Sequence, residues 1–373
     1  PAGGELTGGG GDGPEKKKQA SDDSTWETWW ALTRIEFFPH RYVKAVTSTE
    51  GPQLRGVQAL APVVVREKLW KPLMKLKDDK QVFVREAALI TIGRVASDEG
   101  LRAEARTILL DAIKDPNHLV ARAAALGLFY VADDSCLLPM AKLAENPKAE
   151  PDVRAFLALT LTAMKSDMAG PLLERLITHD KDADFDVQSA ALMGLGYVDG
   201  PAAARRLSET YMDKKFRAEL RAIAVESFGR RGIFADGFKP LSNAVDDRET
   251  QIRRSAAMAL GCLDYRTDAE REIAKLVEPY DTSTGAPLPA DVTAQVETLR
   301  KQVPAQRELM QKDVREVVKK LVHQLENDND DFVSGMCAIS LGRIAAQVDE
   351  SFAIRALERD LKKERNKVRE YEI

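Results

Sequence analysis

The chain has 373 residues, of which 44% are hydrophobic and 31% charged, so it is long and apolar enough to bury a core. Its 55 Lys and Arg residues against 59 Asp and Glu residues leave a net charge of −4, which speaks against a dedicated nucleic-acid-binding protein because phosphate contacts need a basic face. With 3 Cys and 4 His, it has few ligands for a metal site or a disulfide framework.

Residues 1–24 are rich in Gly and charged side chains and contain almost no apolar ones. Such a composition cannot offset the entropy lost on ordering, so we expect a disordered leader. No segment reaches the roughly 18–20 apolar residues of a membrane span. A Gly-rich leader that begins without Met favours an extracytoplasmic or secreted protein after signal removal, and a cytoplasmic location is the alternative.

Residues 25–65 begin with aromatic side chains at helical spacing. Because the ends of a helical array need special outer faces, we interpret this segment as a cap on the helices that follow. An aromatic platform for a ligand or a membrane interface is the alternative. The predicted cap residues are Trp26, Trp29, Trp30 and Phe37.

Residues 66–265 repeat one pattern about 34 residues long, the length of a two-helix unit. Each copy is counted from an anchor residue, and position n is the residue n places beyond the anchor. Apolar or small residues recur at the anchor and at positions 3, 4, 7, 8 and 11, which form one stripe on an α-helix. We therefore predict an anchor helix and a preceding helix in each unit. The anchors are Val84, Val120, Val153, Val187, Leu220 and Ile252, and the pattern returns at Val333.

Position 7 always holds a small residue, which lets two helix backbones approach closely and suits a chain with only 6% aromatic residues. Position 9 holds Gly in several copies, at a cost of about 1 kcal/mol each relative to Ala, so packing must compensate. The small residues are Thr91, Gly127, Thr160, Gly194, Ser227, Ala259 and Ser340, and the glycines are Gly93, Gly196, Gly229, Gly261 and Gly342.

Asp recurs five residues before the anchor and Arg one residue after it. Asp there can cap the amides at a helix start, and the Arg can reach the neighbouring unit. We interpret these residues as a ladder that sets the stacking of units, with a ligand-binding row as the alternative. Lys148 and Lys215 replace the Asp in two units, where we expect interruptions. The ladder comprises Asp79, Arg85, Asp115, Arg154, Asp182, Arg221, Asp247, Arg253 and Asp328.

Residues 266–312 separate the last two anchors and are predicted to be a helical insertion, either a degenerate unit that maintains the stacking or a functional arm. Residues 313–373 are predicted to be further repeats that end mid-repeat, since the pattern restarts at Val368. We expect the apolar face of that half unit to be covered by more of a longer chain or by another molecule.

The shared pattern, D-x4-V-R-x-A-A-x3-(small)-L-G, resembles HEAT repeats in the form found in phycobilisome-lyase-type proteins, over residues 66–265 and 313–373. This resemblance implies an all-α fold, a right-handed α-solenoid (superhelix) related to armadillo arrays, with an inner and an outer row of helices. The W-x2-WW segment after a Gly-rich leader is similar to the start of HEAT-repeat proteins from large exported bacterial families.

The sequence lacks the P-loop, G-x-S-x-G, H-E-x-x-H and dinucleotide-binding motifs. The four histidines are dispersed and stand apart from Cys and from one another, so surface or packing roles are expected of them. We therefore predict no catalytic residues, no metal and no cofactor.

Arg or Tyr recurs at position 10, and both types are enriched at interaction hot spots. If the anchor helices form the inner row, these side chains line a concave groove; alternatively they only cover helix edges. The candidate partner-binding residues are Arg94, Tyr130, Tyr197, Arg230 and Arg343.

The favoured hypothesis is a non-catalytic scaffold that binds a protein or peptide along the concave face and does not bind nucleic acid. The family resemblance leaves two enzymatic alternatives, attachment or isomerisation of a bilin and, at odds with the net charge, excision of DNA bases. A purely architectural spacer in a larger exported assembly is the third alternative.

Overall fold

The computed structural model describes residues 65–96, 99–164, 166–179, 183–280, 287–348 and 354–359 except 356. All of them lie in the second of two compact units into which the chain divides, Leu60–Ile373. The expected leader and Asp182 lie outside the described residues, as do the four predicted cap residues Trp26, Trp29, Trp30 and Phe37.

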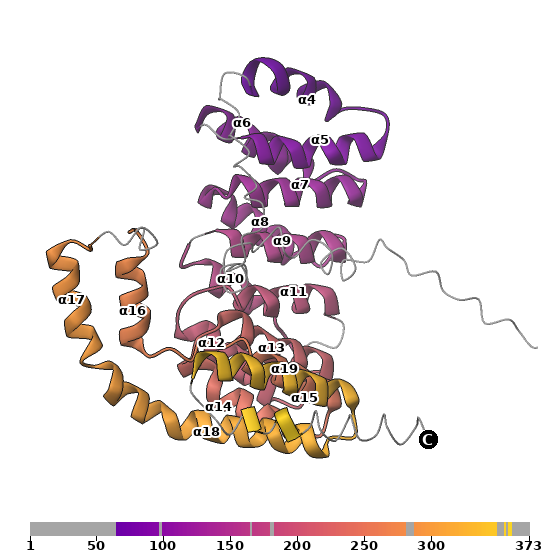
Figure 1. Ribbon diagram of the computed structural model, residues 1–373. Coiled ribbons are helices and arrows are strands. Elements are labelled where there is room, and N and C mark those ends of the chain that lie inside the picture. Colours follow the sequence, from indigo (N-terminus) through magenta and orange to yellow (C-terminus); the bar gives the residue numbers. More distant parts are fainter. Residues whose placement is uncertain are drawn as a thin grey trace, which may run out of the picture. The chain divides into compact units, whose positions relative to one another are not determined.

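The described residues form helices and no β-strand, which confirms the predicted all-α fold class. The anchor helices make a first row, in which each helix packs against the next (Figure 1). This row consists of α5 (Val82–Val95), α7 (His118–Val131), α9 (Pro151–Ala163), α11 (Phe185–Leu195), α13 (Ala218–Arg231), α15 (Thr250–Leu260) and α19 (Asp331–Gln347).

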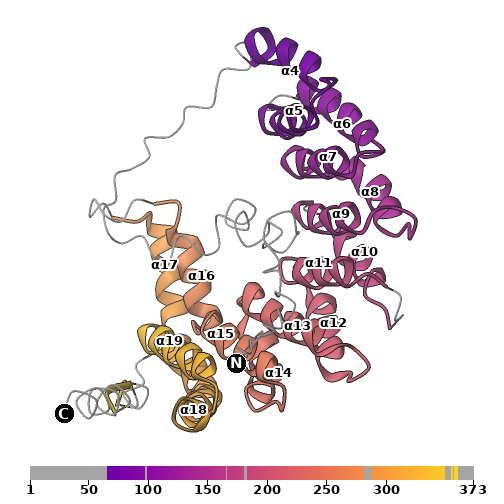
Figure 2. The same cartoon turned by 90° about the vertical axis from the view of Figure 1, so that its right-hand side faces the viewer.

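The preceding helices make a second row, each packed against its own anchor helix. Figure 2 shows the first row on the inner side of the bend that these pairs follow within Leu60–Ile373. The two rows form the predicted α-solenoid of two-helix units. The second row consists of α4 (Lys71–Leu76), which follows the π-helical turn η2 (Val65–Trp70), then α6 (Glu99–Ala112), α8 (Leu137–Ala144), which follows the short turn η3 (Asp134–Cys136), α10 (Ala169–Arg175), α12 (Pro201–Met212) and α14 (Phe234–Ala244).

Successive anchor helices touch where position 9 of one meets position 7 of the next. A Cβ atom on Gly93 would lie 2.7 Å from the Cα atom of Gly127, and one on Gly229 would lie 2.8 Å from the Cα atom of Ala259. A Cβ atom on Gly261 would likewise lie 2.8 Å from Cα of Ser340. Side chains do not approach a backbone this closely, so the tight contact requires Gly at position 9 and offsets its low helix propensity.

The segment between α15 and α19 contains a helical hairpin and one long helix. The hairpin is formed by α16 (Asp268–Val277) and α17 (Ala290–Arg300), and α18 (Val303–Asn327) follows it. The C-terminal half of α18 buries Val314, Val317 and Leu321, and the helix packs on α14 and α19. α18 thus serves as the second-row partner of α19, and the predicted boundary at residue 313 falls inside it.

A capping box fixes the start of α16. The Thr267 hydroxyl accepts a hydrogen bond from the Glu270 amide at 3.2 Å, and the Glu270 carboxylate accepts one from the Thr267 amide at 2.8 Å. Arg307 of α18 pairs with the same carboxylate. Burial raises the pKa of Glu270, but the hydrogen bonds from Arg307 and Thr267 outweigh burial and hold the pKa below its usual value.

Replacing Thr267 by Ala is expected to destabilise the start of α16 by about 1 kcal/mol, because the Glu270 amide loses the Thr267 hydroxyl that accepts its hydrogen bond. Amide hydrogen exchange should then accelerate in α16 and α17 while α5 to α11 stay protected. Thr298→Ala is the matched control, since the Thr298 hydroxyl only donates to the Ala294 carbonyl on an exposed helix face. Equal exchange rates in the two variants would contradict the role of the cap.

Candidate protein-binding surface

The five candidate binding residues lie at the C-terminal ends of first-row helices, and Tyr197 follows the end of α11 by two residues. Arg94 and Arg343 are exposed, while Tyr130, Tyr197 and Arg230 are half-buried. The first row is the inner row, as the binding hypothesis for these residues requires (Figure 2). Arg and Tyr do not recur in every unit, because the units of α9 and α15 have Ala163 and Cys262 at position 10.

Arg94 and Tyr130 join α5 to α7 in one group. Arg94 Nη2 donates a hydrogen bond to the Tyr130 hydroxyl at 2.8 Å, and the guanidinium carbon lies 4.8 Å from the centre of the Tyr130 ring. Phe129 packs edge-to-face on Tyr130, with the ring centres 5.4 Å apart. The guanidinium and the two rings therefore form a preassembled cluster on successive helices.

Arg230 and Arg343 belong to two other groups. Arg230 is ion-paired with Glu226 on its own helix. Its Cβ atom packs closely on Gly196, the residue before Tyr197, since a Cβ atom added to Gly196 would lie only 3.1 Å from it. Arg343 Nη1 lies 3.3 Å from the Cys262 sulfur. The Arg230 side chain is only 10% exposed, so it offers less surface than Arg94.

The ladder arginines each reach a carboxylate of the next unit. The pairs are Arg85 with Asp115 at 3.8 Å, Arg154 with Asp184, Arg221 with Asp247 at 3.2 Å, and Arg253 with Asp328 at 2.7 Å. Arg154 and Arg221 also donate to backbone carbonyls before their own helix, at Ala144 and Tyr211. These guanidinium groups thus tie two units together.

Two details of the ladder differ from the sequence pattern. The partner of Arg154 is Asp184, three residues before its anchor rather than five. The ladder Asp residues do not cap the anchor helix. Instead, the carboxylate accepts a hydrogen bond from the backbone amide two residues later in the chain, as Asp115 does from Asn117 at 2.8 Å. In α7 the cap is Asn117, whose side chain accepts from two amides of the first turn. The ladder Asp therefore shapes the turn that enters the anchor helix.

Where the ladder lacks Arg, histidine takes its place. Ala121 and Gln188 occupy the Arg position in two units. His118 Nδ1 lies 2.9 Å from the Asp152 carboxylate, and His179 Nε2 lies 3.3 Å from that of Asp213. These pairs bridge the units where Lys148 and Lys215 replace Asp. The histidines are dispersed in sequence, so only their recurrence at junctions without Arg could have indicated this role.

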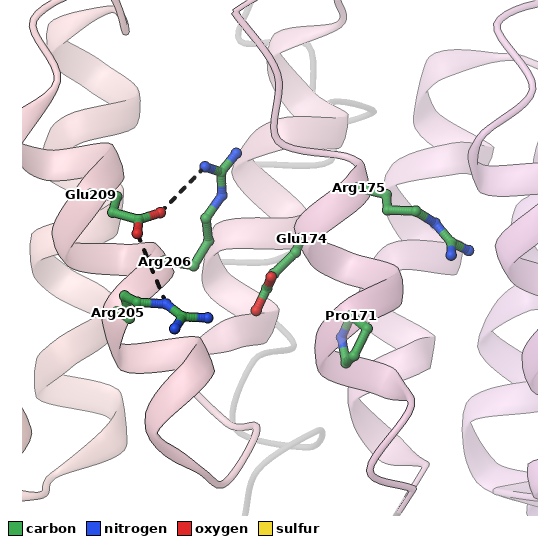
Figure 3. A pocket seen from close by; sticks show the side chains of 6 residues that line it. All are labelled: Pro171, Glu174, Arg175, Arg205, Arg206 and Glu209. Carbon is green, nitrogen blue, oxygen red and sulfur yellow. Dashed lines mark ion pairs between the residues drawn. The ribbon is translucent and has the colours of Figure 1, made fainter.

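A pocket of 590 Å³ opens between α10 and α12 in the second row (Figure 3). Arg175, Arg205, Arg206, Glu174 and Glu209 line it together with Pro171. Glu209 lies between Arg205 and Arg206, at 3.9 and 3.7 Å. The pocket contains none of the residues singled out from the sequence, and its arginines are largely engaged by carboxylates and the Ile177 carbonyl.

The two buried thiols, Cys136 and Cys337, are poor nucleophiles. Burial raises the pKa of Cys136 to about 11 and that of Cys337 to about 12, so both are protonated at neutral pH. Within the described ranges no three His, Cys, Asp or Glu side chains gather in a way that could hold a metal ion. No described helix is long and apolar enough to cross a membrane.

Residues 107–196, which run from α6 through α11, match the HEAT repeats family. This segment carries HEAT repeats. The assignment confirms the resemblance drawn from the repeating sequence pattern. No curated protein matches the sequence at a significant level.

Several solved structures resemble the helical array at low sequence identity. The complex of CpcE and CpcF of phycocyanin lyase from Nostoc sp. PCC7120 is 16% identical, covers 67% of this chain and 98% of its own, and has a TM-score of 0.39. The YibA protein of Escherichia coli is 16% identical, with coverages of 76% and 99% and a TM-score of 0.37. Human deoxyhypusine hydroxylase is 14% identical, with coverages of 78% and 93% and a TM-score of 0.30.

Proposed function

We propose that this HEAT array is a scaffold that holds a protein or peptide partner against its first row of helices, without catalysis. The observation that carries the proposal is the cluster of Arg94, Tyr130 and Phe129 on the inner row. Arg and Tyr dominate binding energy at protein interfaces, and side chains already held by one another lose little entropy on binding.

A second group of charged and aromatic side chains joins α5, α7 and α9 near their N-terminal ends. Arg122 of α7 lies 3.9 Å from the Glu86 carboxylate of α5, and its guanidinium is 5.5 Å from the centre of the Phe156 ring of α9. The Phe156 ring is only 2% exposed, so this group ties the three helices together. The mixed polar and aromatic surface of Arg94, Tyr130 and Phe129 suits a protein partner, whereas the net charge of −4 is unfavourable for nucleic acid.

Replacing Arg94, Tyr130 and Tyr197 together by Ala should weaken partner capture by roughly tenfold or more, while helicity stays unchanged. Capture from an extract of the source organism, followed by titration of the recovered partner, measures the effect. Arg175→Ala with Arg205→Ala is the matched control, because these exposed arginines lie on the second row. Unaltered capture by the triple variant, or an equal loss in the control, would rule out the first-row surface.

A further inference from the structure

Positive charge is concentrated on η2 and α4, which begin the second row. Between Val65 and Gln81, six side chains are basic and three are acidic, a net charge of +3 in a chain whose net charge is −4. Lys68, Lys71 and Lys75 recur at i, i+3 and i+7, so they lie along one side of the continuous helical stretch that η2 and α4 form. All three are exposed, and we call them the lysine stripe.

The other side of this helical stretch is buried in the array. Val65, Trp70 and Leu73 are 3%, 6% and 7% exposed, and α4 packs on α5. This packing fixes the rotation of the helix, so the lysine stripe faces solvent and the apolar side does not.

The lysine stripe has no counter-charge of its own. No carboxylate of the described residues pairs with any of its three ammonium groups. Elsewhere in the second row basic side chains are paired, as Arg106 is with Asp133 at 2.7 Å and Lys320 with Asp246 at 3.0 Å. Like charges three and four residues apart repel and destabilise a helix, so the stripe is unfavourable for folding by itself.

Two of the three acidic residues of this segment are engaged in the turn that follows α4. Lys77 Nζ lies 2.7 Å from the Asp78 carboxylate, and the Asp79 carboxylate accepts a hydrogen bond from the Gln81 amide at 2.8 Å. Glu67, which is exposed, is the third. Three ammonium groups thus share a single nearby carboxylate, and the surface keeps a positive potential.

Two exposed apolar side chains flank the same turn. Leu76 at the end of α4 is 41% exposed, and Phe83 at the start of α5 is 66% exposed. The C-terminal end of the stripe therefore combines positive charge with apolar surface, a combination that provides both attraction and buried area to a protein partner.

We propose that the lysine stripe is a docking surface for an acidic polypeptide segment, separate from the surface on the first row. Carboxylates of such a segment would neutralise the three ammonium groups and remove their mutual repulsion, while Leu76 and Phe83 would contact apolar side chains beside those carboxylates. A membrane surface would require the apolar side of the helix to face outward, and that side is buried. The net charge of −4 disfavours a nucleic acid.

Fluorescence anisotropy of a labelled poly-L-glutamate peptide at low ionic strength tests the proposal in the full chain. Lys68→Glu, Lys71→Glu and Lys75→Glu together should weaken peptide binding by roughly tenfold or more, and the remaining binding should depend less on salt. The three side chains are exposed, so the variant should keep its helicity, which circular dichroism checks.

The matched control is Lys142→Glu, Lys312→Glu and Lys319→Glu. These lysines are also exposed, lie on α8 and α18, and change the charge of the chain by the same amount. The control should bind the peptide within about twofold of the wild type, because long-range charge is screened by salt. Equal weakening in the two variants, or no binding by the wild type, would overturn the proposal.

Two other probes separate the acidic polypeptide from other anionic partners. Vesicles that contain an anionic lipid and duplex DNA should each bind the wild type more weakly than the peptide does. Tighter binding of either probe, lost in the Lys68, Lys71 and Lys75 variant, would overturn the proposal in favour of a membrane surface or a nucleic acid.

Discussion

Gly229→Ala is expected to destabilise the array by about 1–3 kcal/mol, even though Ala is the better helix former. The added Cβ atom would lie 2.8 Å from Cα and 2.9 Å from Cβ of Ala259, so α13 and α15 would have to move apart. Neither of these atoms belongs to the end of a flexible side chain, so no rotamer change can relieve the clash. The midpoint of urea unfolding, followed by circular dichroism, measures the loss.

The matched control is Gly342→Ala, at the same position of α19. No described atom lies within 4 Å of the new Cβ atom, so the substitution should leave stability unchanged or raise it by up to about 1 kcal/mol. The two variants make the same chemical change in the same repeat position and should shift the midpoint in opposite directions. Shifts of the same sign would mean that the close contact between anchor helices does not require Gly.

Asp328→Ala is expected to destabilise the α15–α19 junction by about 3–5 kcal/mol, because it leaves a partly buried guanidinium without its counter-charge. The Asp328 side chain is 2% exposed and accepts hydrogen bonds from Arg253 at 2.7 and 3.1 Å and from the Asp330 amide at 2.9 Å. Calorimetry and hydrogen exchange in α15 and α19 measure the effect. Asp331→Ala is the control, since Asp331 is exposed in the first turn of α19.

This ion pair also predicts how stability changes with acid. Burial raises the pKa of Asp328, but the hydrogen bonds and charge of Arg253 outweigh burial and hold it below the usual value of 3.8. A carboxyl group with a lowered pKa stabilises the fold above its unfolded-state pKa, and this contribution disappears as pH falls through the folded-state value. Below pH 3.8 the wild-type chain should therefore lose stability more steeply than Asp328→Ala. If the stability of both proteins fell equally with pH, this role of Asp328 would be contradicted.

Much of the fold could be predicted from local sequence, because an α-helix turns its periodicity directly into a buried stripe. The anchors, the small residues at position 7 and the glycines at position 9 each depend on spacing within one helix. Ser340 and Gly261 illustrate the strength of this signal: they meet across α15 and α19 although the hairpin and α18 separate them in sequence. The described helices follow the predicted frame at all seven anchors.

The candidate site was predictable only as a set of positions. Spacing put Arg94 and Tyr130 at the same place in successive units, but their hydrogen bond and ring contact depend on the distance between two stacked helices. Spacing also put Arg230 in this set, yet in the structure it is held by Glu226. A periodic pattern specifies which residues share a face, and it does not specify which neighbour each long side chain reaches.

By itself, the sequence determined the class of fold, the two-helix unit, its stacking surface and the acidic and basic residues at the junctions. Only the tertiary structure decided that Arg154 pairs with Asp184, that His118 and His179 bridge the junctions without Arg, and that α18 is both part of the insertion and partner to α19. The reason is physical: helix periodicity acts over a few residues, whereas these contacts depend on loop paths and on the offset between stacked units.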